Sequence, residues 1–398
     1  MINFQQFFID VAWPLAILLA WFVGEVGHQW LRLPRISSYA LVGFIFAPSQ
    51  LGLLPQMQSS MLLLANIAFG LLLFECGYRI NLRWLKSNPL ITATSLTEAA
   101  LTFAAVYFVS SYFDQSVSTS LLLAALSMAS SPATIVRVIN EQRSSGQVTE
   151  RILHLSAMNC VLSVFAFKVI VGFVVFQTSG DLWDASYSSL IVLGISILLG
   201  VAAGVFIPGL LRFTNRTSND STLAFTIAII GVVALAHSLK LSPVLAALVF
   251  GLTVRHRRIV MKTSQRGFGA LGDLLSILLF VFIASTLQWE QVYAGIGLGL
   301  AIIAVRQLAK IAGIGLFSFV SGVSWRKGLL IGMATTPVSA FVILVLEQTR
   351  YIGISFVDQL APLATVALTM EVFGPIFVQR ALIWAHEVPE GKESSHAP

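Results

Sequence analysis

Apolar stretches about 20 residues long constrain this chain more than any other feature of its sequence. A helix of about 20 predominantly apolar residues crosses the ~30 Å hydrocarbon core of a bilayer, and such stretches recur along the whole chain. Charged residues make up only 11% of the 398 residues, against roughly a quarter in soluble domains. The sequence therefore predicts an all-α polytopic membrane protein and excludes an ordinary soluble globule.

Thirteen stretches are predicted to span the membrane. In chain order they are residues 9–29, 36–54, 60–80, 89–112, 118–140, 151–177, 187–211, 221–239, 241–255, 268–287, 291–320, 327–347 and 358–382. An external N-terminus places 19 Lys and Arg residues on the cytoplasmic side and only Lys240 and Arg350 in external connections. This bias follows the positive-inside rule, so the basic residues predict a cytoplasmic C-terminus rather than a nucleic-acid-binding stripe.

The two halves of the chain resemble each other at an offset of 205–209 residues. The aligned segments are 33–34 (LP) with 242–243 (SP), 40–44 (ALVGF) with 247–251 (ALVFG), 71–74 (LLLF) with 278–281 (LLFV), and 130–133 (SSPA) with 335–338 (TTPV). Six spans in each half, joined by one linking helix, invert the second copy relative to the first. Inverted repeats of this kind are the usual architecture of secondary transporters.

Pro132 and Pro337 occupy corresponding places in the two halves, each inside a predicted span. Proline removes an amide donor and frees a carbonyl, which membrane helices tolerate where the loosened backbone lines a cavity or finds new partners. We expect two broken helices, 5 and 12, that cross at the midplane. Freed carbonyls and the hydroxyls of Ser130, Ser131 and Thr134 would form an ion site there. The alternative is a pair of packing kinks.

Four small polar residues of the predicted span 151–177 form a stripe along one face of the helix. Asn159 and Cys160 carry it, with Ser156 and Ser163 to either side, and these spacings place all four on one helical face. Small polar residues also hold membrane helices together, which is the simpler interpretation of the two serines. Asn159, at the expected midplane, is a candidate ion ligand.

Four ionisable residues lie deep inside predicted spans, where a buried charge is costly and marks a functional candidate. The repeat offset places Glu98 opposite Arg306, so these two are expected to pair, with Lys310 one turn later as the alternative partner. Such a pair could equally serve only to hold two helices together. Glu371 has no expected partner, which makes it a candidate proton or cation group.

Several segments together resemble the monovalent cation/proton antiporter family of the sodium/hydrogen exchanger superfamily, in the branch of bacterial potassium-efflux antiporters. The resemblance covers almost all of the chain and rests on the order and spacing of its segments. These are 32–48, which starts with Arg-Leu-Pro, 73–77 (LFECG), 130–138 (SSPATIVRV), 158–160 (MNC), Arg306 with Lys310, and 371–375 (EVFGP).

The resemblance implies a homodimeric antiporter that exchanges Na⁺ or K⁺ for protons. It implies a transmembrane domain over residues 1–385, with dimerisation helices 1–3 and 8–10, linking helix 7 and core helices 4–6 and 11–13, followed by a short polar cytoplasmic tail, 386–398. The family carries a carboxylate at the second position of the helix 6 pair, where this chain has Cys160. A thiol, with a reference pKa of about 8.5, is a poor ligand for hard cations. Asn159, the hydroxyls and the freed carbonyls are therefore the expected ligands, and Glu371 or Glu98 is the expected proton carboxylate.

The leading hypothesis is a secondary active cation/proton exchanger in a bacterial-type inner membrane. One alternative is an anion or organic-solute carrier on the same fold, in which Arg306 faces a negative substrate. Another is a non-transporting sensor or scaffold with a degenerate transporter core. An enzyme is not expected, because no Ser-His-Asp spacing, P-loop or metal-ligand cluster occurs. The expected partners are a monovalent cation, protons, the lipid bilayer and a second copy of the chain, with no cofactor, resident metal or nucleic acid.

Overall fold

The computed structural model describes residues 4–55, 59–179, 190–213, 221–257, 268–340, 342–344 and 360–389. Helices account for all the long regular elements in these ranges, which confirms the predicted all-α class. Arg350, residues 390–398 of the predicted tail and residues 345–347 of the twelfth predicted span lie outside the described residues.

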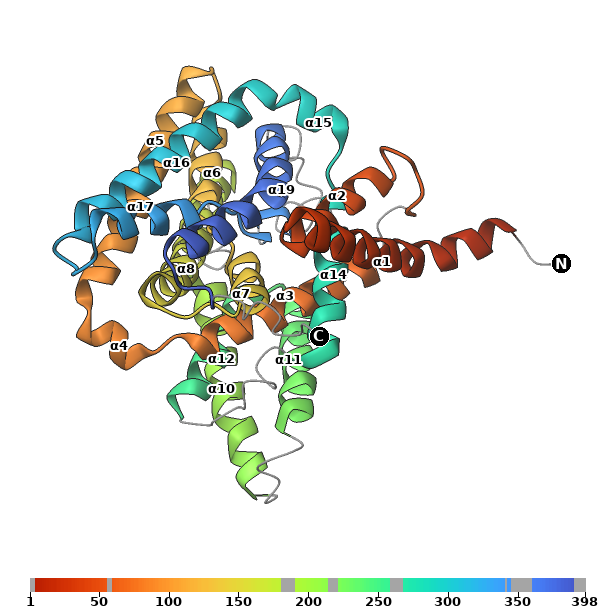
Figure 1. Cartoon of the computed structure of the whole chain (residues 1–398), viewed down its shortest axis with the longest axis horizontal. Coiled ribbons are helices and arrows are strands. Elements are labelled where there is room, and N and C mark those ends of the chain that lie inside the picture. Colours follow the sequence, from red (N-terminus) through yellow and green to blue (C-terminus); the bar gives the residue numbers. More distant parts are fainter. Residues whose placement is uncertain are drawn as a thin grey trace, which may run out of the picture.

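Sixteen helices have defined bounds in the described ranges (Figure 1). They are α1 (Phe4–Leu31), α2 (Arg35–Phe46), α3 (Ser59–Arg79), α4 (Leu82–Ser87), α5 (Pro89–Tyr112), α6 (Val117–Ser127), α7 (Pro132–Gln142), α8 (Gln147–Ser179), α10 (Val192–Phe213), α11 (Ser221–Ser238), α12 (Pro243–His256), α14 (Gly269–Ser285), α15 (Trp289–Ala294), α16 (Ile296–Ser318), α17 (Trp325–Ala334) and α19 (Ala361–Trp384).

Every predicted span holds at least one described helix. By length and composition, eight helical segments of the described part could cross a membrane alone: α1, α3, α5, α6 with α7, α8, α10, α16 and α19. Shorter apolar helices, α2, α11, α12 and α14, occupy four further predicted spans. The structure therefore supports a polytopic membrane protein, while the total of thirteen crossings stays a prediction.

Two helix pairs related by the sequence repeat cross in the same way. A Cβ atom on Gly43 of α2 would overlap the carbonyl oxygen of Val281 in α14, and a Cβ on Gly251 of α12 would overlap that of Phe74 in α3. The repeat aligns 40–44 with 247–251 and Phe74 with Val281, so the two contacts join corresponding segments, with the glycine one position later in the second half. Small residues at such crossings let helix backbones approach closely in membranes.

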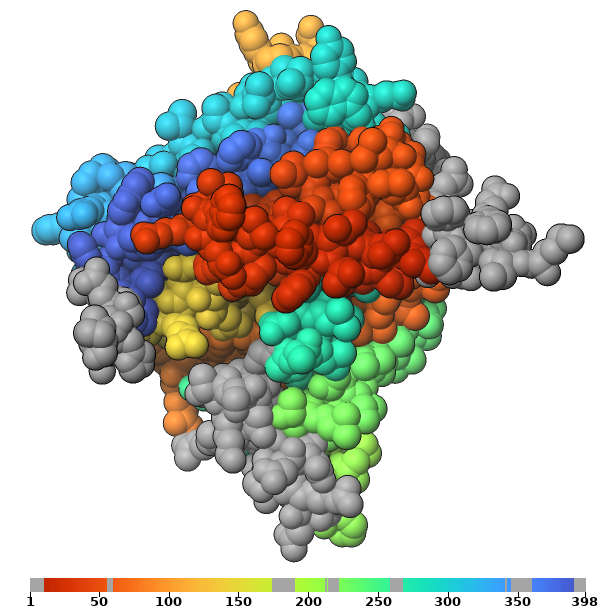
Figure 2. Space-filling view, turned by 45° about the vertical axis from the view of Figure 1, so that its right-hand side comes forward, coloured from red at the N-terminus to blue at the C-terminus, as the bar shows by residue number. Residues whose placement is uncertain are grey.

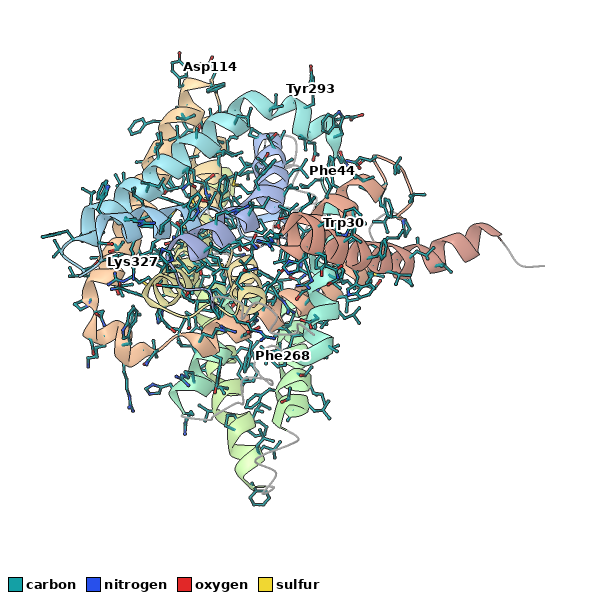
Figure 3. The ribbon with its side chains drawn as sticks, in the orientation of Figure 1. Trp30, Phe44, Asp114, Phe268, Tyr293 and Lys327 are labelled. Carbon is teal, nitrogen blue, oxygen red and sulfur yellow. The ribbon has the colours of Figure 1, made fainter. Side chains whose placement is uncertain are left out.

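The arrangement in space follows from these pairs. α5 packs along α16 at one side of the molecule, α10, α11 and α12 gather at the opposite end, and α6, α7, α8 and α19 lie between them (Figure 1). α1 runs across the surface over α2 and α14 (Figure 2). Asp114, after α5, and Tyr293, in α15, project from the same edge (Figure 3). Asp114 lies in a connection predicted to be external, and Tyr293 lies at the predicted external end of the span 291–320.

Candidate functional site

Two helices are interrupted where the prolines predict it. α6 ends at Ser127, and α7 begins with Pro132 in its first turn, where the missing amide costs no helical hydrogen bond. The Ser131 side chain caps α7 by accepting a hydrogen bond from the Thr134 amide at 3.3 Å. In the second half, α17 ends at Ala334, three residues before Pro337. Each interruption leaves backbone carbonyls without helical donors.

The two interruptions are hydrogen-bonded to each other. The Ser131 amide donates to the Pro337 carbonyl at 2.9 Å. The Ser130 hydroxyl donates to the Thr335 carbonyl at 3.0 Å, and all four residues are buried. The two broken helices therefore meet at one place in the structure, which we call the crossing and define by residues 127–134 and 335–339.

Arg306 of α16 caps the freed carbonyls at the crossing. Its guanidinium donates to the carbonyls of Ser127 and Ala129 at 2.8 Å each, of Thr336 at 2.5 Å and of Pro337 at 3.4 Å. A guanidinium offers five N–H donors in a fixed planar fork, so one buried side chain replaces several lost helical donors. Within the described residues, the Arg306 hydrogen bonds all go to backbone carbonyls, and none goes to Glu98.

Glu98 pairs with Lys310, the alternative partner in the sequence analysis. The Lys310 ammonium donates to Glu98 Oε1, and both side chains are 0% exposed. Thr102 donates to the same oxygen at 3.3 Å, while the Asn159 amide donates to Oε2 at 2.5 Å. Ser95 in turn donates to Asn159 Oδ1 at 2.9 Å. The carboxylate is thus held by α5, α8 and α16 together.

This polar cluster touches the crossing directly. Lys310 Nζ lies 3.1 Å from Ser130 Oγ and 3.3 Å from the Met128 carbonyl oxygen. Asn159 Nδ2 lies 3.4 Å from Ser130 Oγ. A carboxylate therefore lies one side chain away from the broken backbone, although residue 160 is a cysteine.

A glycine makes this arrangement possible. A Cβ atom on Gly313 of α16 would lie 2.6 Å from the Glu98 Cα atom, closer than packed atoms can approach. Because Gly313 follows Lys310 by three residues, both belong to the same face of α16. The close contact of α16 with α5 at Gly313 brings the ammonium within reach of the carboxylate.

Cys160 is fully buried, and its sulfur lies 3.9 Å from the Ser339 hydroxyl, just beyond the second interruption. The two flanking serines bond to backbone instead. Ser156 donates to the Leu153 carbonyl and Ser163 to the Ala125 carbonyl. Of the predicted stripe, Asn159 and Cys160 therefore face the crossing, whereas Ser163 joins α8 to α6 and Ser156 bonds within α8.

Glu371 of α19 takes no part in the hydrogen bonds of the Glu98 cluster. It is 3% exposed, and its Oε2 atom has no hydrogen-bond partner in the described part of the chain. Gly374, one turn later, packs against Pro337, where a Cβ would lie 3.1 Å from the proline ring. α19 therefore packs against the second interruption, and its Glu371 carboxyl group has one oxygen without a hydrogen bond in the described residues.

Sequence reasoning missed two hydroxyls and one glycine of this site. Ser95 and Thr102 flank Glu98 at spacings of three and four residues, and both bond within the cluster. The sequence could have predicted the two hydroxyls, because residues at these spacings share one helical face with the buried charge. It could not have predicted the role of Gly313, which depends on which helix packs against α16.

A second group of polar contacts ties α7 to its neighbours beyond the crossing. Arg137 Nη1 lies 2.6 Å from Asp273 of α14, and Asn140 donates to Glu75 of α3 at 2.9 Å. Glu141 accepts from Arg35 of α2 at 3.2 Å. In the part of the chain that the structure describes, no group of three His, Cys, Asp or Glu side chains could hold a metal ion.

Comparisons with known proteins agree with this fold. The sequence model described as "Sodium/hydrogen exchanger, transmembrane" matches residues 15–384. The structure of the sodium proton antiporter MjNhaP1 from Methanocaldococcus jannaschii at pH 8 is similar, with a TM-score of 0.66, 17% identity and coverage of 96% of this chain and 97% of that one. An electron-microscopy map of the same antiporter gives a TM-score of 0.70, 17% identity and 100% coverage of both chains. At this identity the likeness concerns the fold alone. No curated protein matches the chain.

Proposed function

This chain belongs to the sodium/hydrogen exchanger family, and from that premise we propose that it is a secondary active transporter exchanging Na⁺ or K⁺ for protons. The proposed ion site is the cluster of Glu98, Asn159 and Ser130 at the crossing. The observation that carries the proposal is the 2.5 Å hydrogen bond from Asn159 to the buried Glu98 carboxylate. This hydrogen bond holds the Glu98 carboxylate beside the crossing, so the site has a carboxylate although residue 160 is a cysteine.

The ligand chemistry of this cluster suits a monovalent cation. Hard cations prefer oxygen ligands, and the cluster offers the Glu98 carboxylate and the Ser130 hydroxyl, while the Asn159 amide oxygen faces Ser95. Carbonyls freed by the two interruptions add neutral oxygens. Cys160 has no place in this set, because its sulfur is a soft ligand and faces Ser339.

The charges in the cluster couple the cation to a proton. A buried carboxylate needs a positive partner, and Lys310 fills that role in the structure. A cation bound beside the lysine ammonium would place two positive charges against one negative charge. Binding therefore requires the site to release one proton, from Lys310 or from a protonated Glu98. One carboxylate balances one cation or one proton, so the exchange is one for one and electroneutral.

Arg306 has a supporting role in this scheme. Its guanidinium does not release its proton in the physiological range, and its hydrogen bonds go to four backbone carbonyls of the crossing. It holds the two interruptions together while the neighbouring lysine responds to the cation. Because the arginine is already engaged with carbonyls, an anion carrier that uses it as the substrate contact is disfavoured. A degenerate scaffold would not need the Glu98 cluster.

The assembly and orientation follow the same proposal. We place the N-terminus outside and the C-terminus in the cytoplasm of a bacterial-type inner membrane, as the 19-to-2 distribution of basic residues supports. Helices α5 to α8, α16, α17 and α19 would form the moving core. Helices α1 to α3 and α11, α12 and α14 would form the dimerisation bundle, and α10 the link. The contacts of α7 with α2, α3 and α14 would then join core and bundle.

Proteoliposomes with an enclosed pH dye test the exchange. A proton gradient should dissipate when Na⁺ or K⁺ is added, and the Glu98→Gln variant should lose the response. Glu290→Gln is the matched control, because Glu290 is exposed in α15. If Na⁺, K⁺ and Li⁺ all leave the gradient intact between about pH 6 and 9, the exchanger proposal fails. If Glu98→Gln retains full exchange, the site is elsewhere.

A further inference from the structure

A basic cavity lies at the ends of α3, α4 and α12, away from the crossing. It has a volume of about 250 Å³, and Arg83, Arg255 and His256 line it together with Ile80 and Leu252. No acidic residue of the described chain lines it. It thus combines two or three positive charges with an apolar wall, on the side that the basic residues predict to be cytoplasmic.

The walls of the cavity are held rigidly by the α3 and α12 pair. A Cβ on Gly77 of α3 would overlap the Leu248 carbonyl oxygen of α12, and Gly251 makes the reciprocal approach to Phe74. These two contacts lie close to the end of α3 at Arg79 and about one to two turns before the end of α12 at His256. The positions at which α3 ends and α12 presents Arg255 are therefore set by backbone packing rather than by flexible side chains.

The arginines of the cavity are not neutralised by protein carboxylates. Arg83 and Arg255 make no ion pair among the described residues. The Arg255 guanidinium lies 5.6 Å above the Tyr78 ring, which orients the side chain without cancelling its charge. With no carboxylate among its described lining residues, this cavity keeps its positive charge.

Helix α4 brings Arg83 to the cavity and carries residues that favour a membrane interface. The Asn81 side chain caps the helix by accepting hydrogen bonds from the Arg83 and Trp84 amides at 3.1 and 3.3 Å. Trp84 packs against His154, with ring centroids 4.6 Å apart, and tryptophan favours the membrane interface. Leu82 is also exposed next to Arg83. α4 therefore has the mixed basic and apolar character of an interfacial segment.

We propose that this cavity binds the phosphate headgroup of an anionic phospholipid from the cytoplasmic leaflet. Arg83 and Arg255 bind the phosphate oxygens, for which guanidinium forks are suited, and Ile80 and Leu252 contact the glycerol and the first methylenes. Basic pockets between transmembrane helices on this side recognise such headgroups. The site is independent of the proposed exchange, since none of its residues belongs to the Glu98 cluster.

Native mass spectrometry of the full chain in a neutral detergent tests the proposal. The probes are short-chain phosphatidylglycerol, phosphatidylcholine and inorganic phosphate, and the variants are Arg83→Gln and Arg255→Gln. Arg326→Gln is the matched control, because Arg326 is an exposed arginine of α17 on the same predicted side and does not line the cavity. We expect retention of phosphatidylglycerol but not of phosphatidylcholine. Each cavity variant should bind phosphatidylglycerol about five-fold more weakly and the control should not change, since one basic residue near an anionic headgroup contributes about that factor.

Two outcomes overturn the proposal. One is equal retention of phosphatidylglycerol by all three variants, which would place the lipid elsewhere. The other is displacement of the lipid by inorganic phosphate at low millimolar concentration, which would make the cavity a site for a free phosphate anion. Because both mutated arginines are exposed, their variants should keep the wild-type unfolding temperature without lipid, and loss of lipid then reports on the cavity itself.

Discussion

Removing the charge of Glu98 alone is predicted to destabilise the protein far more than removing Glu98 and Lys310 together. Both side chains are 0% exposed. In Glu98→Gln, the ammonium of Lys310 keeps only neutral acceptors, the Met128 carbonyl at 3.3 Å and the Ser130 hydroxyl at 3.1 Å. A buried charge left without its partner costs about 3–5 kcal/mol.

The Lys310 variant and the double variant complete a double-mutant cycle with Glu98→Gln. Lys310→Met leaves the Glu98 carboxylate with only the neutral donors Asn159 and Thr102, so its cost should also be about 3–5 kcal/mol. Glu98→Gln with Lys310→Met contains no unpaired charge, and replacing a buried pair by neutral residues is often nearly neutral. We therefore expect the double variant to lie within about 2 kcal/mol of the wild type, with strong coupling between the two positions.

The assay is thermal unfolding of the purified protein in detergent, with exchange in proteoliposomes measured beside it. For a chain of 398 residues, one kcal/mol corresponds to about 1.2 °C in the midpoint. Each single variant should lose about 4–6 °C and the double variant about 2 °C or less, while all three should lose exchange. Lys327→Met is the control, because Lys327 is 36% exposed and lies 3.9 Å from its acidic neighbour. Additive losses in the double variant would refute the reasoning.

Three further predictions concern the same core. Cys160→Asp adds a second buried carboxylate at the crossing, so exchange should become sensitive to an imposed membrane potential, whereas Cys160→Ser should stay insensitive; equal responses would contradict the charge count. Gly313→Ala places a methyl group 2.6 Å from the Glu98 Cα atom and should cost about 1–3 kcal/mol in the unfolding assay. Gly297→Ala on the same helix meets nothing within 4 Å and should be harmless; similar losses would argue against close packing. Arg306→Lys keeps the charge but cannot reach four carbonyls, so the exchange rate should fall at least about tenfold, and an unchanged rate would show that the capping is dispensable.

Local chemistry was enough to predict the spans and their interruptions. An apolar run of about 20 residues has few options other than to cross a bilayer, and each predicted range contains a described helix. Pro132 and Pro337 lie at the two interruptions, where the missing amide breaks no helical hydrogen bond. Pro14, Pro208 and Pro375 lie inside continuous helices, so a proline alone does not predict a break. The corresponding places of Pro132 and Pro337 in the repeat were needed as well.

The partner of Glu98 depended on packing between helices. The repeat offset favoured Arg306, but the structure pairs Glu98 with Lys310 and directs Arg306 to the carbonyls. The two basic residues are four positions apart on one face of α16, so sequence spacing cannot separate them. The close approach at Gly313 decides the matter, because it sets which turn of α16 lies beside the carboxylate.

The sequence by itself determined that this chain spans a membrane, where two of its helices break, and that position 160 is a cysteine rather than a carboxylate. Only the tertiary structure decided where a carboxylate would stand instead. Glu98 and Asn159 are 61 residues apart in the chain, and their contact exists because α5, α8 and α16 pack around the crossing. A long-range contact between buried polar groups depends on the whole packing arrangement, which no local pattern of residues encodes.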